Sequence, residues 1–192
     1  MAVIALDRGH VGRNYGNVTK AGAQSGSLNE DVLAREYMRA IEDTLRAAGH
    51  EVILLCHGTY SSRQAFASPI ADVFVACHVN AGGGTYGLVC YDHRSKSGPV
   101  LAQTVANELQ RAWGSTPENP LSKTVAAAAS SEKWENAWNL IKGVYSGKPV
   151  GLVFEPFFLD QKHHACMATP EGLARTGKAL ADGIIAWLAG RT

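Results

Sequence analysis

The stretch Asp72-Val73-Phe74-Val75-Ala76-Cys77-His78-Val79-Asn80 decides the expected fold of this 192-residue chain. Its short apolar run is typical of a strand that is buried on both faces, as in a parallel sheet. Glycines follow closely at 82–84, so a loop must begin there. His78 is therefore expected at the carboxyl end of a central strand, the edge at which open α/β sheets form their binding sites.

Two other apolar runs end in a similar way. One ends at Leu6 and leads into a turn that contains His10, and another, at 150–154, ends directly before Glu155. Because parallel strands share their carboxyl ends, His10, His78 and Glu155 are expected at the same edge of one sheet. Three strands that each deliver a polar group to one edge indicate a single site.

Strand and helix patterns alternate along the chain, which predicts βαβ units and a parallel sheet. Ser27 and Glu30 have the spacing of a capping box, and a helical apolar repeat follows from Leu33 until Gly49. Further strands are expected at 51–56 and 86–91, a short helix at 61–67, and longer helices that begin at Pro99 and Pro170. We expect one α/β domain, residues 1–192, with a twisted, mostly parallel sheet covered by helices.

Two segments have no regular pattern. Residues 11–29 form a long loop rich in glycine and polar residues, and loops of this length usually carry function. Residues 114–149 contain three prolines and an alanine run at 126–129. We expect this second segment to be irregular, with one short helix near 134–142.

The composition is that of a globular protein, with 46% hydrophobic and 18% charged residues. Lys and Arg number 18 against 17 for Asp and Glu, which argues against a nucleic-acid or anionic-membrane binder. Without a signal-peptide pattern or an apolar run of membrane-spanning length, synthesis in the cytoplasm and no membrane insertion are expected. The cysteines have no CxxC spacing and are expected to be reduced, buried thiols: Cys56, Cys77, Cys90 and Cys166.

His10, Glu30 and His78 make a His₂Glu set, which is the ligand set of catalytic zinc sites that keep a fourth position open for water. These residues are scattered along the chain, and each has a structural alternative. His10 could be an ordinary loop histidine, and Glu30 could serve only as the partner in the capping box. His78 is harder to explain in this way, because a histidine that closes a buried strand needs a partner.

Other polar residues are candidates for the same site. A carboxylate at the end of an apolar strand, such as Glu155, costs free energy unless it is paired or functional. Asp7 is a candidate acceptor for the free ring nitrogen of a liganding histidine. The adjacent pair His163 and His164, which precedes a polar turn, is expected in solvent and not on a metal.

These segments together resemble the zinc-dependent N-acetylmuramoyl-L-alanine amidases, often called amidase 3, a group that includes several phage lysins. Residues 7–10 resemble the family motif D-x-G-H, residues 76–81 resemble S-x-H-x-N-A, and residues 153–158 resemble the late motif with the catalytic glutamate. Glu30 stands at the start of the first long helix, where the family has its second metal ligand. Departures from the residues frequent in the family affect loop shape and substrate contacts more than the chemistry: Arg8, Val11, Ala76 and Phe157.

The resemblance implies hydrolysis of the amide that joins the lactyl group of N-acetylmuramic acid to L-alanine in peptidoglycan. It implies one Zn²⁺ per chain on His10, Glu30 and His78, and Glu155 as the catalytic residue that moves protons. Asn80 is then expected to contact the substrate or to support a neighbouring site residue. Peptidoglycan is the expected partner, with no nucleic acid.

Two other functions stay open. One is a zinc carboxypeptidase or endopeptidase that cuts peptidoglycan stem peptides, and the other is a catalytically silent wall-binding module with the same fold. No separate wall-binding domain is recognised. A compact enzyme made in the cytoplasm for a wall substrate suits a phage endolysin that lyses the cell wall after holin-dependent release, while a bacterial amidase with a missing export sequence is the alternative.

Overall fold

The computed structural model describes residues 1–10, 22–114 and 120–191. Its centre is a six-stranded sheet in the order β4-β1-β5-β8-β6-β7. Neighbouring strands run parallel except for the antiparallel pair of β6 and β8, which confirms the expected α/β fold with a mostly parallel sheet. The strands are β1 (Val3–Arg8), β4 (Glu51–Leu55), β5 (Val73–Cys77), β6 (Tyr86–Asp92), β7 (Lys123–Ala129) and β8 (Val150–Glu155).

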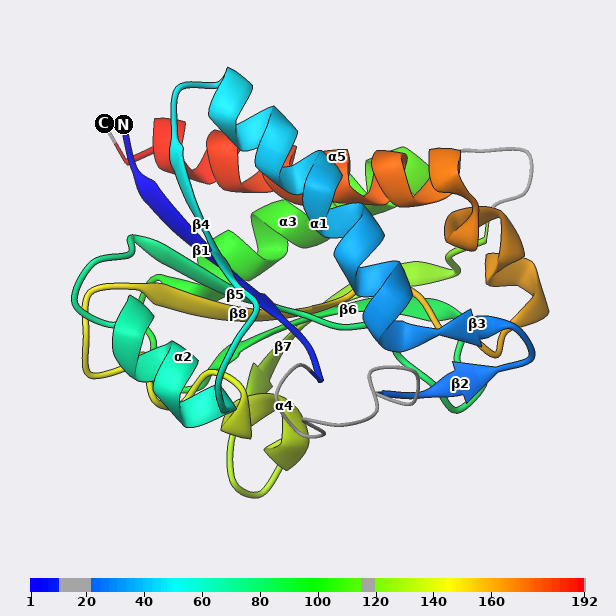
Figure 1. The fold of residues 1–192 in the computed structure, drawn as a ribbon, viewed down its shortest axis with the longest axis horizontal. Coiled ribbons are helices and arrows are strands. Elements are labelled where there is room, and N and C mark those ends of the chain that lie inside the picture. The colour runs from blue at the N-terminus through cyan, green and yellow to red at the C-terminus, as the bar shows by residue number, and fades with distance from the viewer. Residues whose placement is uncertain (11–21, 115–119, 192) are drawn as a thin grey trace.

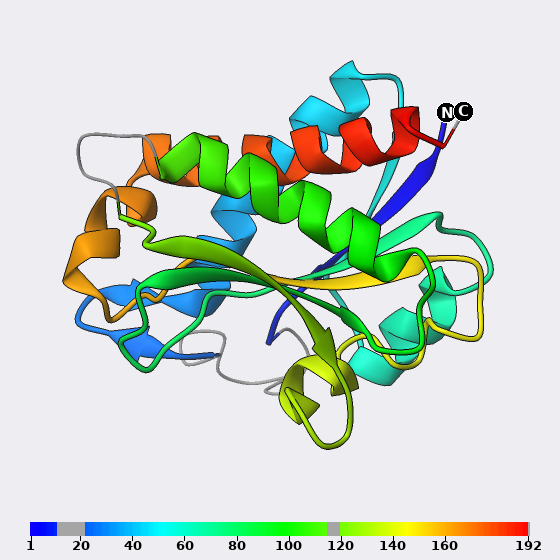
Figure 2. The same cartoon turned by 180° about the vertical axis from the view of Figure 1, so that it is seen from behind.

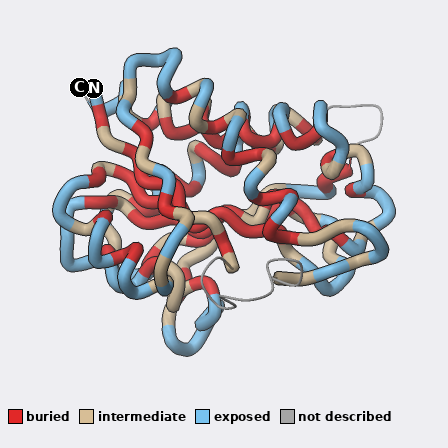
Figure 3. The backbone as a smooth tube through the Cα atoms, viewed as in Figure 1, coloured by how far each residue is buried: buried red, intermediate tan, exposed pale blue. Residues whose placement is uncertain are grey.

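Helices cover both faces of this sheet, so the molecule has three layers (Figures 1 and 2). One face carries α1 (Glu30–Ala47), α3 (Gly98–Trp113) and α5 (Pro170–Ala189). The other face carries the shorter helices α2 (Tyr60–Ala67) and α4 (Glu135–Asn139). Figure 3 shows that burial is concentrated in the sheet and on the helix sides that face it. No helix in the described part of the chain is long and apolar enough to cross a membrane.

The central strand β5 is buried at every residue, as its uninterrupted apolar sequence predicts. Val75 belongs to the larger core under α1, α3 and α5, while its neighbour Phe74 belongs to the smaller core under α2 and α4. The register places Cys77, the last residue of β5, opposite both Arg8 in β1 and Phe154 in β8. The residues that follow these positions therefore meet at the same edge of the sheet.

The expected capping box is wrong, because α1 begins later than that motif requires. The N-cap is Asn29, whose side chain accepts a hydrogen bond from the backbone N–H of Val32. Ser27 lies instead in the turn between two short strands, β2 (Gln24–Ser25) and β3 (Leu28–Asn29). The carboxylate of Glu30 is thus not used as a capping group. The rest of the expected loop, residues 11–21, lies outside the described residues.

The expectation of an irregular segment at 114–149 is also wrong. It contains the edge strand β7 as well as α4, which confirms the short helix; residues 115–119 lie outside the described part. Alanine is uncommon in strands, so the run at 126–129 hides the strand from a pattern based on side chains. Backbone pairing with β6 holds this strand in place.

All four cysteines are free thiols, as expected. Only Cys77 and Cys90 are fully buried, whereas Cys56 and Cys166 are partly exposed, so the expected burial is correct for two of the four.

Candidate metal centre and acid–base site

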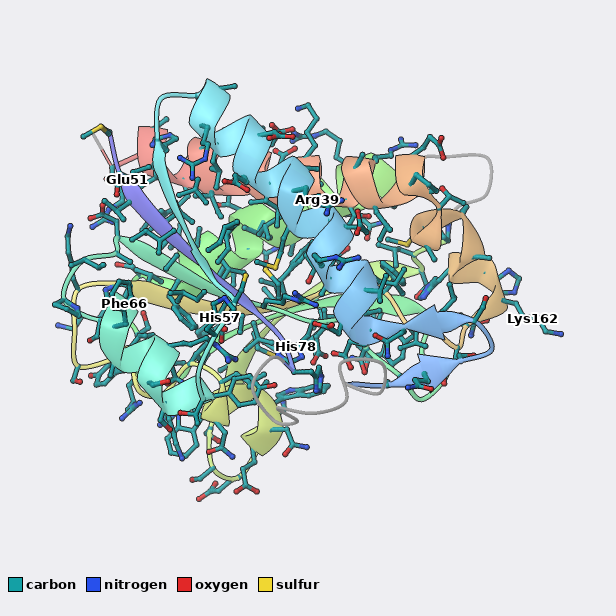
Figure 4. All side chains as sticks on the ribbon, viewed as in Figure 1. Arg39, Glu51, His57, Phe66, His78 and Lys162 are labelled. Atoms are coloured by element: carbon teal, nitrogen blue, oxygen red, sulfur yellow. The ribbon has the colours of Figure 1, made fainter. Side chains whose placement is uncertain are left out.

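The strand ends bring His10, His78 and Glu155 to one edge of the sheet, as the sequence predicted. His78 directly follows β5, and its backbone N–H donates to the carbonyl of Phe154 across 3.0 Å. Figure 4 shows His78 beside the carboxyl end of β1. These three residues and Glu30 line a common pocket with a volume of about 460 Å³.

The carboxylate of Glu30 lies between the two histidines. Its Oε2 is 2.9 Å from Nε2 of His10, and its Oε1 is 2.9 Å from Nδ1 of His78. The backbone N–H groups of Ala23 and Val79 donate to the same two oxygens, across 2.9 Å and 3.1 Å. Burial opposes the charge, but the hydrogen bonds from the two histidines outweigh it and hold the pKa of Glu30 well below its usual range. Glu30 is therefore a carboxylate in this site.

His78 is buried, with 5% of its surface exposed. Burial lowers the pKa of His78, although the nearby Glu30 carboxylate acts in the opposite direction. The ring is therefore neutral at pH 7 and carries a nitrogen lone pair. Its Nε2 has no hydrogen-bond partner among the described residues, which is costly for a buried polar atom unless a ligand satisfies it.

These observations fit a bound divalent cation. One candidate ligand atom from each of His10, Glu30 and His78 lies within 4.8 Å of the others. Two imidazoles and one carboxylate are donors that Zn²⁺ accepts readily, and three protein donors leave a coordination position for water or substrate. The residues present therefore suit the metal that the sequence pattern indicates.

The backbone around His10 is held in an unusual shape. His10 has a φ of 62°, in the left-handed region that few non-glycine residues adopt, and its N–H donates to the hydroxyl of Tyr60 across 2.9 Å. Gly22, with a φ of 80°, packs tightly against the cluster. A Cβ at Gly22 would lie 2.8 Å from Oε2 of Glu30 and 2.9 Å from Cδ2 of His10, so only glycine fits there.

Glu155 stands apart from the His₂Glu cluster and has different electrostatics. Burial and the negative charge of Glu30 raise the pKa of Glu155 to about 7, while His10 and a hydrogen bond from Asn80 act against that rise. The Nδ2 of Asn80 donates to Oε2 of Glu155 across 2.6 Å. Asn80 Oδ1 accepts from the N–H of Ala81, which fixes the orientation of the carboxamide. A carboxyl group with a pKa near neutrality can both take up and release a proton at pH 7.

The expected contact between Asp7 and a liganding histidine is absent from the described residues. Asp7 Oδ1 instead forms a buried ion pair with Nε of Arg63, and Asp7 Oδ2 has no partner there. Burial raises the pKa of Asp7 to about 7, although the guanidinium of Arg63 lowers it. Arg63 also donates to the carbonyl of Gly58 across 2.6 Å. Asp7 therefore anchors α2 to β1.

The expectation that both adjacent histidines lie in solvent is wrong for His164. Only 1% of its surface is exposed, and its Nδ1 accepts a hydrogen bond from the backbone N–H of Phe158 across 2.8 Å. His164 belongs to the 3₁₀ helix η2 (Lys162–Ala168) and supports the loop that follows β8. Its neighbour His163 is exposed. Neither belongs to the metal-ligand group found among the described residues.

Several residues of the pocket were not anticipated from the sequence. They are Tyr60 on α2 and, from the α4 region, Asn136, Asn139 and Leu140. Tyr60, Arg63 and Ala67 have the spacing of one helix face, which marks a buried side of α2 but does not tell which other segment it contacts. No sequence pattern placed the α4 residues in the pocket, because the position of α4 depends on the strand β7, which the sequence did not reveal.

A site at the carboxyl edge of an α/β sheet, with nitrogen and carboxylate donors and a separate carboxyl group of near-neutral pKa, is of a kind that hydrolases use. A family profile described as N-acetylmuramoyl-L-alanine amidase matches residues 4–186, and the chain belongs to that amidase 3 family. A search of curated proteins gave no match.

Solved structures of two amidases and of an endolysin catalytic domain share the fold. The CwlD amidase from Clostridioides difficile, solved in complex with the GerS lipoprotein, has a TM-score of 0.75 and 17% identity, covering 99% of this chain and 100% of that one. The catalytic domain of CwlV from Bacillus (Paenibacillus) polymyxa var. colistinus has a TM-score of 0.73 and 19% identity, covering 98% of this chain and 99% of that one. The catalytic domain of an endolysin targeting Clostridia Difficile has a TM-score of 0.64 and 19% identity, covering 97% of this chain and 98% of that one.

Proposed function

We propose that this chain hydrolyses the amide bond between N-acetylmuramic acid and L-alanine in peptidoglycan with one zinc ion as its cofactor. Membership of the amidase family sets the reaction class. The observation that carries the proposal is one pocket that combines the His10–Glu30–His78 cluster with the separate carboxyl group of Glu155. Metal-assisted hydrolysis of an amide uses both kinds of group.

His10, Glu30 and His78 would hold the zinc ion. When bound, zinc supplies Lewis acidity, which polarises a carbonyl group and lowers the pKa of a water ligand towards neutrality. The low pKa of Glu30 and the neutral ring of His78 keep both side chains in the form that binds a cation. Tyr60 holds the backbone of His10 and so keeps this ligand in position.

Glu155 supplies the proton transfers. With a pKa of about 7, its carboxylate form accepts a proton from the attacking water at neutral pH. The protonated carboxyl group then donates to the departing nitrogen of L-alanine, which leaves as an amine. Asn80 holds Oε2 of Glu155 throughout and thereby orients the carboxyl group towards the reacting atoms.

Analysis of the ends released from purified peptidoglycan tests this function. A new L-alanine amino terminus is expected, in amounts that follow the zinc content of the preparation. An internal stem-peptide residue at the new terminus would instead identify a zinc carboxypeptidase or endopeptidase. No new terminus from the zinc-loaded protein, with binding to cell walls retained, would identify a silent wall-binding module.

We extend the proposal to lysis of the cell wall by a phage endolysin that is made in the cytoplasm and released through a holin-dependent lesion. The shared fold with an endolysin catalytic domain supports this extension. Addition of the protein to wall suspensions should lower their turbidity in step with the release of L-alanine termini. Release of those termini without a fall in turbidity would limit the role to wall modification.

A further inference from the structure

One wall of the site pocket is formed by residues that the hydrolytic steps do not use. This wall is formed by Asn136, Ala137 and Asn139 of α4 and by Leu140 directly after it. We call these four residues the α4 wall. Its carboxamides and its leucine lie in the same pocket as the metal cluster, so a substrate that reaches the cluster can also reach the wall.

The α4 wall is held rigidly from two sides. On one side the buried side chain of Gln64 on α2 donates to the carbonyl of Asn139 across 3.1 Å and accepts from the N–H of Gly143 across 2.6 Å. On the other side Nε1 of Trp138 donates to Asp92, the last residue of β6, across 3.1 Å. A wall fixed in this way loses little conformational entropy when a ligand binds.

The chemistry of the wall suits a peptide. Asn136 is exposed, and no described residue forms a hydrogen bond with its carboxamide. A carboxamide offers both a donor and an acceptor, the pair that a peptide amide presents in return. The ammonium of Lys142, 2.5 Å from Oδ1 of Asn139, adds a positive charge beside the wall for the carboxylates of a stem peptide.

The shared pocket indicates which part of the substrate reaches the wall. Glu155 and the four residues of the α4 wall line the same cavity. The carboxyl group that protonates the departing amine must lie beside that amine, so the leaving group begins in the cavity that the wall lines.

We propose that the α4 wall binds the stem peptide, which is the leaving-group part of the substrate, and that Asn136 forms hydrogen bonds with one of its backbone amides. The assignment to the leaving-group side rests on the proposed function. Backbone strain marks the same region: Trp134, two residues before Asn136, is exposed and has a φ of 60°, a costly conformation for a bulky residue.

Two substrates of different stem length test this assignment. For Asn136→Ala, the KM of a muramoyl tetrapeptide should rise roughly threefold to tenfold, as expected for the loss of one or two neutral hydrogen bonds, with kcat and zinc content unchanged. The KM of N-acetylmuramoyl-L-alanine, whose stem is a single residue, should stay within about twofold. Asn107→Ala is the matched control, because Asn107 is an exposed asparagine of α3 on the opposite face of the sheet. An equal effect on both substrates, or none on either, would overturn the assignment.

A binding measurement separates this inference from the proposed reaction. The probe is the stem tetrapeptide with a free L-alanyl amino terminus, titrated by calorimetry into zinc-loaded Glu155→Gln. Adding Asn136→Ala to that variant should weaken binding threefold to tenfold. If the wild type cleaves neither substrate but binds the tetrapeptide through Asn136, the reaction is wrong and the peptide site stands. If it cleaves both substrates without any contribution from Asn136, only the peptide site is wrong. If it neither cleaves nor binds, both are wrong.

Discussion

Asn80 donates a hydrogen bond to Glu155 across 2.6 Å, from Nδ2 to Oε2, and this contact joins the loop after β5 to the end of β8. Backbone bonds reinforce the junction: the N–H of Asn80 donates to the carbonyl of Phe157, and the N–H of Leu159 donates to the carbonyl of Asn80, both across 2.9 Å. The carboxyl group of Glu155 is thus held by contacts with the loop after β5, and not by contacts with the His10–Glu30–His78 cluster. His78 lies two residues before Asn80, so one short loop positions both a member of the His10–Glu30–His78 cluster and the residue that holds Glu155.

Replacing Asn80 with alanine should shift the pH dependence of the reaction. Its hydrogen bond favours the ionised form of Glu155, so its loss raises the pKa of that carboxyl group and moves the rising limb of the kcat/KM profile to higher pH. At pH 7 the rate should fall by roughly tenfold or more, while zinc content stays the same. A pH–rate series paired with metal analysis checks this, and an unshifted profile would show that Asn80 does not tune Glu155.

The buried ion pair of Asp7 and Arg63 should matter greatly for stability. Arg63→Met removes the cation and the hydrogen-bond donors that face the buried carboxyl group of Asp7, which should lower the free energy of unfolding by about 3–5 kcal/mol in denaturant titrations. Combining it with Asp7→Asn replaces the carboxyl group that has lost its partner with a neutral amide and should restore part of the loss. Lys178→Met, which removes an exposed pair with Asp182, should cost less than about 1 kcal/mol. Equal losses for Arg63→Met and Lys178→Met would contradict the anchoring role.

The sequence predicted the elements that have a clear local pattern. It did not predict the element that depends on pairing with a distant segment. The apolar run of β5 and the polar residues that close β1, β5 and β8 were sufficient to place His10, His78 and Glu155 at one edge, because parallel strands share their ends. The strand β7 escaped detection, since its alanines carry no strand signal and its pairing with β6 is a long-range contact.

Long-range contacts also explain why the positions of the Asp7 and His164 side chains were predicted wrongly. Asp7 was expected beside a histidine because it is close to His10 in the sequence, but the strand turns its side chain towards Arg63, 56 residues away. His164 was expected in solvent, yet the loop after β8 folds back over it and uses its ring as an acceptor. Neither outcome has a local pattern. Glu30, in contrast, was predicted as a ligand from the family resemblance at the start of the first long helix, and its carboxylate lies between His10 and His78.

Metal analysis should find about one zinc ion per chain, and exhaustive chelation should abolish activity that added zinc restores. Glu30→Gln should bind zinc much more weakly, since an amide replaces the carboxylate between His10 and His78. The helix start should survive, because Asn29 is the N-cap of α1. Glu36→Gln, a change at a partly exposed position on the same helix, serves as the control. Full activity after verified metal removal, or full zinc affinity in Glu30→Gln, would contradict the assignment of this cluster.

Glu155 should also make the stability of the metal-free protein depend on pH. Its folded-state pKa of about 7 lies above the usual 4.5, so the folded state holds the extra proton and stability is lost as pH rises from 4.5 through 7. Glu155→Gln removes this loss and should be the more stable protein at pH 8, by at most about 3 kcal/mol. The difference should vanish near pH 4. Denaturant titrations at several pH values on chelated protein measure it, and a difference that grows towards low pH would give the opposite sign of the pKa change.

Glu155→Ala separates proton transfer from metal binding. Since Glu155 lies outside the His10–Glu30–His78 cluster, zinc content should change little, while kcat falls by roughly a hundredfold or more. Glu155→Asp should recover little of that rate, because the shorter side chain moves the carboxylate by about one carbon–carbon bond length and out of hydrogen-bond reach of the reacting atoms. Zinc stoichiometry and turnover must be measured on the same preparation. Loss of zinc from Glu155→Ala would make Glu155 a metal ligand, whereas near-normal turnover would place the general base elsewhere in the pocket.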